Sequence, residues 1–173
     1  MNPVIDAILA RRSCRDFTGE ALPAEHVELL KESLRWAPSA GNRQPWRFIL
    51  VGDRGTRVHL GEAAYGQMFI ADAPLIVVVV ALPEVSAGRY GDRGRELYCL
   101  QDTAAAVQNL LLAAHSLGYC SCWVGAFDEG GVRRVLSLGA DERPVALAPV
   151  GKGTYAEERT DRVPSKKIFH ELP

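Results

Sequence analysis

The chain has 173 residues, of which 47% are hydrophobic and 24% are charged. This composition is typical of one soluble globular domain and excludes a disordered or fibrous protein. A chain of this length buries enough surface to fold without a metal or disulfide scaffold. Its 20 basic and 21 acidic side chains give a net charge of -1, so attraction of the whole molecule to nucleic acid or to an anionic membrane is not expected.

The four cysteines, Cys14, Cys99, Cys120 and Cys122, are too few for a disulfide framework. We predict buried, reduced thiols in a cytoplasmic protein. Cys120-x-Cys122 lacks the CxxC spacing of metal sites, and no metal is expected. The longest apolar run, residues 73–82, is far shorter than the roughly 20 residues that span a bilayer, so no membrane partner is expected either.

The first half of the chain contains clear helix and strand signals. Asn2-Pro3 supplies an N-cap and a first helical residue, which predicts a helix up to Arg11. A second helix opens at Pro23 and must end before Pro38. The run LIVVVVAL after Pro74 has no polar alternation, which predicts a strand covered on both faces. A short strand over 47–51 and a weaker helix over 54–63 complete this half.

The second half begins with three glycines among charged residues over 84–94, which predicts a mobile excursion that could cover a site. The segment 96–117 is apolar nearly all round and predicts a helix that is buried on most sides and ends at Gly118. The remaining expected elements are a strand over 121–124, a helix over 132–138 and a strand over 145–150.

The order of these elements predicts the architecture. Strands separated by helices, with no repeat and no linker, indicate a single α/β domain over 1–173 with three layers. The strand order does not follow from the pattern. The charged, proline-containing tail from about residue 152 has too little apolar pattern to fold alone. We therefore expect the tail to lie on another surface, such as a second subunit.

A basic run, Arg11-Arg12-Ser13-Cys14-Arg15, comes directly after the first helix. Cations at this position complement the helix dipole. The same arginines and the serine hydroxyl could instead form a site for a phosphate. Two further cations, Lys166 and Lys167, could join that anion or belong to a solvated tail.

Residues 37–46, APSAGNRQPW, form a second polar cluster between a helix and a strand. They are either a rigid loop or a preformed surface that presents amide, hydroxyl and backbone donors to a planar ligand. By contrast, GKGTYA at 151–156 matches the dinucleotide fingerprint G-x-G-x-x-G/A only in its letters, because no βαβ unit follows it.

Several blocks together resemble the FMN-dependent nitroreductase family, in particular its short members. They are RRSCRDF, APSAGNRQPWRFILV, FIADAPLIVVVV, DTAAAVQNLLLAAHSLGYCSCWVGAF and the cationic tail, in the family's order. The resemblance implies an α+β, three-layer α-β-α sandwich with a mixed central sheet. It also implies an obligate homodimer with flavin sites at the interface, in which the helix over 96–117 forms the dimer core and the tail, about 152–173, wraps the partner.

The resemblance also implies which residues bind FMN. Those expected at the phosphate and ribityl end are Arg11, Arg12, Ser13 and Arg15, joined by Lys166 or Lys167. Those expected along the flavin edge are Trp123, Val124 and Gly125, with Gln67 near its polar rim. Those expected from the other subunit are Pro38, Ser39, Ala40 and Asn42. Some relatives have a glutamate at the position of Gly125, and many have a serine at that of Ala40.

The implied activity is electron transfer from NADH or NADPH through FMN to a nitroaromatic, a quinone or a similar small acceptor, by a ping-pong scheme. No catalytic side chain is expected, because the cofactor carries the chemistry. The alternatives are reductive dehalogenation or flavin fragmentation at the same FMN site, and a non-catalytic FMN-binding protein whose 84–94 segment blocks access. The acceptor, and the choice between NADH and NADPH, do not follow from the sequence.

Overall fold

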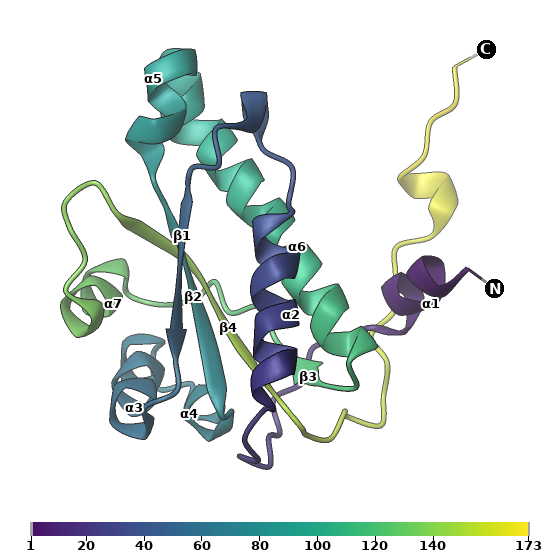
Figure 1. The fold of residues 1–173 in the computed structure, drawn as a ribbon. Coiled ribbons are helices and arrows are strands. Elements are labelled where there is room, and N and C mark those ends of the chain that lie inside the picture. The colour runs from purple at the N-terminus through teal and green to yellow at the C-terminus, as the bar shows by residue number, and fades with distance from the viewer. Residues whose placement is uncertain (1, 173) are drawn as a thin grey trace.

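A computed structural model describes residues 2–172 as a four-stranded sheet between two layers of helices (Figure 1). Its strands are β1 (Trp46–Val51), β2 (Leu75–Ala81), β3 (Cys120–Ser121) and β4 (Arg143–Gly151), in the spatial order β1-β2-β4-β3. All three neighbouring pairs of strands are antiparallel. The mixed character expected of the sheet is therefore limited, within residues 2–172, to one parallel bridge between Ser13 and Ser121.

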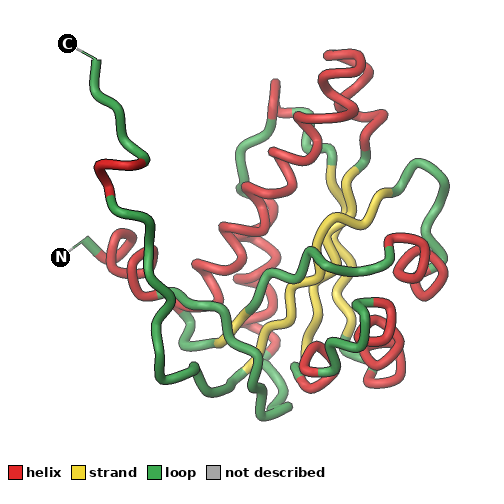
Figure 2. Tube along the Cα trace, turned by 180° about the vertical axis from the view of Figure 1, so that it is seen from behind, coloured by secondary structure: helices red, strands yellow, loops and turns green. Residues whose placement is uncertain are grey.

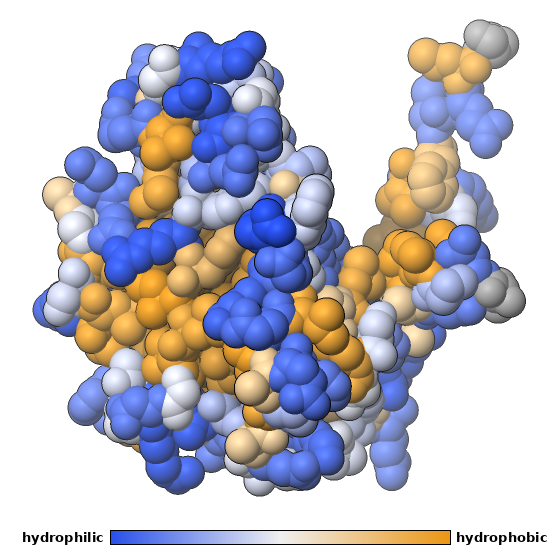
Figure 3. Space-filling model, viewed as in Figure 1, coloured by the Kyte–Doolittle hydropathy of each residue, from blue (hydrophilic) through white to orange (hydrophobic). Residues whose placement is uncertain are grey.

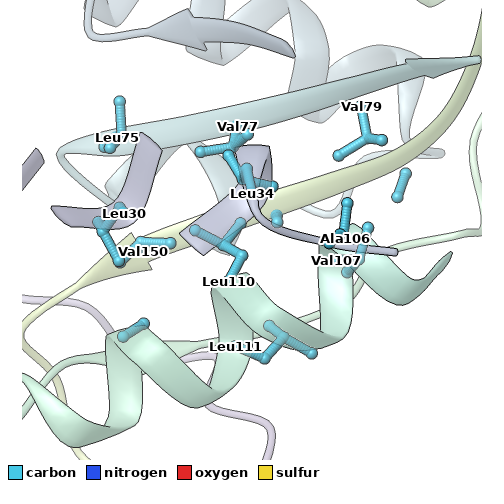
Figure 4. Close-up of a cluster of buried hydrophobic side chains, with 14 of the residues drawn as sticks. Leu30, Leu34, Leu75, Val77, Val79, Ala106, Val107, Leu110, Leu111 and Val150 are labelled. Carbon is cyan, nitrogen blue, oxygen red and sulfur yellow. The ribbon is translucent and has the colours of Figure 1, made fainter. Parts of the chain in front are cut away.

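Strand β2 lies at the centre of both cores, and all seven of its residues are buried, as its apolar run predicts. Residues 75, 77 and 79 face one helical layer, formed by α2 (Ala24–Arg35) and α6 (Cys99–Ser116). Figure 4 shows Val77 and Val79 above Leu34, Leu110 and their neighbours in this layer. Burial of each such side chain contributes roughly 1.5–3 kcal/mol to folding.

The alternate residues of β2, 76, 78 and 80, face the opposite layer. That layer consists of α3 (Arg54–Ala63), α4 (Phe69–Asp72) and α7 (Glu129–Leu136). Figure 2 shows helices on both sides of the strands, which confirms the three-layer prediction. The helix over 54–63 has the predicted bounds, whereas the single turn α4 was not predicted, because four residues carry too little periodicity.

The N-terminal helix α1 (Pro3–Ala10) confirms its capping signal, since the Asn2 side chain accepts a hydrogen bond from the Val4 N–H at 2.9 Å. None of the residues of α1 is buried. Beyond β4, the tail runs past α1 and carries a short helix, η3 (Ser165–Lys167), which projects from the body (Figure 1). Figure 3 shows apolar side chains on the surfaces of both α1 and the tail.

The expectation of a mobile excursion over 84–94 is wrong. These residues form α5 (Pro83–Arg93), which continues through the π-helical turn η2 (Gly94–Tyr98) into α6. Tertiary contacts override the glycine content: Arg95 pairs with both Glu84 and Asp92. Gly94 lies so close to the Ser86 carbonyl, at 2.6 Å from where a Cβ would stand, that only glycine fits there.

The other expected elements differ mainly at their ends. The helix predicted over 96–117 is divided between η2 and α6, and the strand predicted over 121–124 comprises β3 and an isolated bridge from Val124 to Leu147. Helix α6 buries the side that faces β2 and α2, while Gln101 and Gln108 remain exposed. No helix within residues 2–172 is both long and apolar enough to cross a bilayer.

Candidate functional site

Five arginines from opposite ends of the sequence surround one pocket of about 230 Å³. They are Arg11, Arg12, Arg15, Arg159 and Arg162. None of them forms an ion pair with another part of the chain over residues 2–172. Glu158 is the one acidic side chain among the described lining residues. The excess of positive charge suits this pocket to an anion.

Backbone pairing with β3 positions the basic run. Ser13 bridges Ser121, and the Cys14 N–H donates to the Ser121 carbonyl at 2.9 Å. The tail binds the other side of the run, because the Thr154 N–H donates to the Asp16 carbonyl at 3.0 Å. The basic run is thus held between β3 and the start of the tail.

Side-chain contacts extend this pairing into the pocket. Arg12 donates from Nη1 to the Ala156 carbonyl at 3.2 Å, and its guanidinium lies 5.0 Å from the centroid of the Tyr155 ring. Arg159 donates to the Leu9 carbonyl at the end of α1. The tail therefore brings its own cations to the pocket by binding the N-terminal segment.

An extended segment, residues 123–125, continues along the same edge of the sheet, and we call it the amide edge. The N–H groups of Cys122 and Val124 donate to the Pro149 and Leu147 carbonyls of β4, at 3.3 and 2.9 Å. Because donors alternate in direction along an extended chain, the N–H groups of Trp123 and Gly125 are directed away from β4. Neither of these two donates a hydrogen bond within the described chain.

The two outer residues of this amide edge, residues 123–125, are also exposed, whereas Val124 between them is buried. Trp123 is 40% exposed. A Cβ placed on Gly125 would meet no atom within 4 Å. Residues 123–125 therefore offer two unused donors to a ligand that lies against the sheet edge beside the arginines.

Gln67 lies at the far side of this edge. Its Nε2 donates to the carbonyls of Ala64 and Ala126, both at 2.9 Å. Its amide nitrogen is therefore occupied by the protein's own backbone, and Oε1 is the group left to face a ligand. Nearby, the Arg15 guanidinium lies 5.9 Å from the Phe69 ring centroid, which links α4 to the basic run.

The predicted residues Pro38, Ser39, Ala40 and Asn42 lie at the other end of the molecule, around the short helix η1 (Ala40–Asn42). The Ala40 N–H donates to Asp102 near the start of α6, at 3.0 Å. The arginine pocket lies near the end of α6, where the Tyr155 hydroxyl is 3.5 Å from His115 Nδ1.

The 13 residues from Asp102 to His115 span roughly 20 Å of helix, and Figure 1 shows the two ends well apart. A single chain therefore does not bring the turn over 38–42 to the arginine pocket. The structure joins the basic run, the amide edge and Gln67, and it leaves the turn at the opposite end.

Lys166 and Lys167 lie on η3, outside the residues that line the pocket. Arg159 and Arg162 occupy the lining instead, and the sequence analysis did not single them out. The signal that could have found them is the charge run ERTDR over 158–162, which lies closer in sequence to the paired segment 152–154 than the lysines do.

Thiols lie beneath the basic run. All four cysteines are free and buried, as predicted. Burial raises the pKa of the Cys120 thiol to about 12 and that of the neighbouring Tyr155 hydroxyl to about 12. Burial also raises the pKa of Cys122, although Arg15 opposes that shift. These groups stay protonated at neutral pH, so they provide no activated nucleophile.

The chain is similar to known proteins over most of its length. The family model described as the nitroreductase family matches residues 8–74 and 63–152. The chain belongs to the nitroreductase family. A protein of Archaeoglobus fulgidus whose name assigns it to the NADH dehydrogenase/NAD(P)H nitroreductase class is 35% identical over 162 residues, which cover 92% of this chain and 89% of that protein. The FMN reductase (NADPH) of Bacillus subtilis is 28% identical, covering 99% and 74% of the two chains.

Solved structures show the same fold. Nitroreductase A from Vibrio parahaemolyticus superposes with a TM-score of 0.90 at 25% identity, covering 99% of this chain and 76% of that one. An NADH dehydrogenase/NAD(P)H nitroreductase-type structure from Parabacteroides distasonis gives a TM-score of 0.86 at 27% identity, with 98% of each chain covered.

As a nitroreductase family member, the chain is an FMN-dependent oxidoreductase that uses NADH or NADPH. The observed donor set fits this cofactor, because a pocket with five arginines and one acidic side chain suits a phosphate and the adjacent amide edge suits the polar rim of a flat ring.

Proposed function

We propose that this nitroreductase passes electrons from NADH or NADPH through FMN to a nitroaromatic, a quinone or a similar small acceptor by a ping-pong scheme. The observation that carries the proposal is the continuity between the arginine pocket and the amide edge at 123–125. This continuity gives one elongated ligand a charged end and a hydrogen-bonding end. FMN has this distribution of groups.

In this proposal each group of residues has a defined task. The phosphate and the ribityl chain are held by Arg11, Arg12, Ser13 and Arg15, with Arg159 and Arg162 beside them. Lys166 and Lys167, which lie on η3 outside the pocket lining, would join only if the tail moved toward the pocket. Trp123, Val124 and Gly125 lie along the ring edge. Gln67 presents its Oε1 to the polar rim.

We further propose that the chain, one domain over 1–173, acts as a homodimer in which a second copy completes the site. The turn with Pro38, Ser39, Ala40 and Asn42 lies roughly 20 Å from the arginine pocket along α6, so it reaches a pocket only across a subunit interface. Uncovered apolar surface supports this arrangement: Val4 and Leu9 on α1 are 61% and 52% exposed, and Phe169 in the tail is 70% exposed. Patches of this kind mark interaction surfaces.

When bound, FMN supplies the redox chemistry, accepting electrons from the reduced nicotinamide and delivering them to the acceptor. The chain's residues bind and orient it. The N–H groups of Trp123 and Gly125 stabilise negative charge at the ring edge, since they are fixed in place by the pairing of Cys122 and Val124 with β4. The arginines neutralise the phosphate. No side chain is required to transfer a proton as a general acid or base.

Substitution of the pocket arginines tests the cofactor site. We expect Arg11→Ala or Arg15→Ala to raise the FMN dissociation constant about tenfold or more, because each removes a charge-assisted contact. Fluorescence titration of the apoprotein with FMN measures this change. Arg35→Ala is the matched control, because this arginine is exposed on α2 and pairs only with Glu32 among the described residues. If either pocket variant purifies with a full complement of FMN, its assigned role is wrong.

Reductive dehalogenation is a second candidate, favoured by one relative. The iodotyrosine deiodinase of Haliscomenobacter hydrossis is 26% identical over 172 residues, covering 82% of this chain and 75% of that protein. Anaerobic mixing with NADH or NADPH separates the candidates. Rapid bleaching of the flavin absorbance followed by turnover of a nitroaromatic or quinone supports the proposed activity. Inertness to both nucleotides contradicts it and favours the second candidate.

A further inference from the structure

The turn over 38–42 and the residues just after it contain three positions with left-handed backbone. Gly41 and Asn42 have φ values of 54° and 53°, and Gln44 follows with 51°. Glycine adopts left-handed geometry freely and asparagine tolerates it, so the strain falls on Gln44, two residues beyond Asn42. Such strain persists only where surrounding contacts over-determine the conformation.

The hydrogen bonds inside the turn are local. The Asn42 N–H donates to the Ser39 carbonyl and the Gln44 N–H donates to the Ser39 hydroxyl, both at 2.9 Å. Over residues 2–172, one hydrogen bond ties positions 38–42 to another element of the fold, from the Ala40 N–H to Asp102 Oδ1 on α6. Asp102 is therefore the polar anchor of the turn.

Burial of the Asp102 carboxyl group at this position costs folding free energy. Asp102 is 7% exposed, and its Oδ2 atom has no hydrogen-bond partner within the described chain. Burial raises the pKa of its carboxyl, and the bond from Ala40 opposes that shift. An apolar side chain would avoid the cost of burying an unpaired oxygen. Packing alone therefore does not account for an acid at this place in α6.

We propose that Asp102 is a positioning residue of the FMN site, holding the turn over 38–42 in the one shape that contacts the cofactor of the partner subunit. The proposal rests on the proposed function, in which that turn completes the second copy's site. Asp102 touches neither cofactor nor substrate. It acts by raising the fraction of molecules in which the turn is competent, and the apparent affinity for FMN scales with that fraction.

Two substitutions separate the hydrogen bond from the charge. Asp102→Leu removes the acceptor and should raise the FMN dissociation constant about tenfold, corresponding to a turn that is competent about one tenth of the time. Asp102→Asn keeps an oxygen acceptor for the Ala40 N–H and should stay within about threefold of the wild type. Both constants come from fluorescence titration of the apo dimer.

Thr103→Val is the matched control. Thr103 is the next residue on α6, is also buried, and uses its hydroxyl only for the Cys99 and Leu100 carbonyls of the same helix. We expect Thr103→Val to leave FMN affinity within about twofold, even where it changes the urea midpoint of the apoprotein. Affinity and stability therefore report separately, and a merely structural role for Asp102 would lower the midpoint and leave affinity unchanged.

Ala40→Pro removes the N–H group that donates the same hydrogen bond to Asp102. Ser39 has φ -144° and ψ 153°, which a following proline tolerates. If the bond is what matters, Ala40→Pro added to Asp102→Leu should weaken FMN binding little further than Asp102→Leu alone.

The proposal is overturned if Asp102→Leu binds FMN as the wild type does, if Asp102→Asn is as weak as Asp102→Leu, or if the effects of the two substitutions in the double variant are fully additive. Arg15→Ala in the same titration distinguishes the two failures. If Arg15→Ala loses FMN while Asp102→Leu retains it, the cofactor site is correct and only the anchoring role is wrong. If Arg15→Ala also retains FMN, the proposed site itself fails.

Discussion

The chain covers its apolar side chains differently in two regions of the molecule. One region is the pair of helical layers around β2, and the other is the projecting pair formed by α1 and the C-terminal tail. Ile76 and its β2 neighbours lie between two helical layers and are fully buried. On α1, Val4, Ile5 and Ile8 are 61%, 47% and 47% exposed. Strand β2 and helix α1 are both largely apolar in sequence, so hydrophobic content alone does not show which of them is covered in a single chain. The contrast is consistent with the proposed homodimer, in which a second copy covers the projecting pair.

The largest effect should come from deleting residues 157–173. The deletion removes the apolar tail residues and the two tail arginines of the pocket, so we expect a monomer that retains no FMN after size-exclusion chromatography. A double variant, Arg159→Ala with Arg162→Ala, separates the two losses, because it should weaken FMN binding and remain dimeric. A truncated chain that is still dimeric and yellow would contradict the comparison between the two regions.

Ile76→Ala should give the next largest effect. It opens a cavity between β2 and the layer of α3, α4 and α7, and we expect the free energy of unfolding to fall by about 2–5 kcal/mol. Urea denaturation at a fixed subunit concentration measures this loss. A change below about 1 kcal/mol would mean that the core around β2 is less tightly packed than the structure shows.

The same substitution in the projecting region, Ile8→Ala, should act differently. Alanine is a better helix former than isoleucine, and Ile8 is 47% exposed in the single chain, so α1 itself should lose little stability. We expect the dimer dissociation constant to rise roughly tenfold through lost apolar contact. Sedimentation velocity across a concentration series checks this, and an unchanged dissociation constant would place Ile8 outside the interface.

The smallest effect concerns Asp102 and pH. Burial raises the pKa of this carboxyl above its unfolded value, so the folded state holds the proton more tightly. The wild type should therefore lose stability as pH rises from below the ordinary Asp pKa of about 3.9 through the raised pKa. Asp102→Asn does not titrate, so its stability relative to the wild type should increase over that window. Urea midpoints measured across this pH range test the sign, and a difference that is flat with pH would contradict it.

Features that depend on neighbouring residues could be predicted from the sequence, whereas features that depend on contacts between distant residues could not. Asn2-Pro3 acts within one helical turn, and the prediction of α1 is confirmed. The β-branched run after Pro74 correctly predicted a strand buried on both faces. The glycines over 84–94 predict a mobile segment, but these residues are helical in the structure. The contacts of Arg95 with Glu84 and Asp92 join residues up to 11 positions apart and outweigh the local flexibility of the glycines.

The residues of the candidate site also differ in how far the sequence alone predicts them. The basic run and the segment 123–125 could be found from sequence because their residue types and order resemble the family. Arg159 and Arg162 are visible in the sequence only as part of the charge run over 158–162, because their place in the pocket depends on how the tail pairs with the segment 16–18. Asp102 was also missed, since its hydrogen bond spans 62 positions along the chain.

The sequence by itself determined the layered α+β class, the helices with capping and proline signals, the central buried strand and the family, because short-range backbone preferences and hydrophobic pattern carry that information. Only the tertiary structure decided the strand order β1-β2-β4-β3, the helical state of residues 83–93, the arginines that share one pocket and the roughly 20 Å between that pocket and the turn over 38–42. These features depend on contacts between residues distant in sequence, and such contacts form only when the whole chain packs.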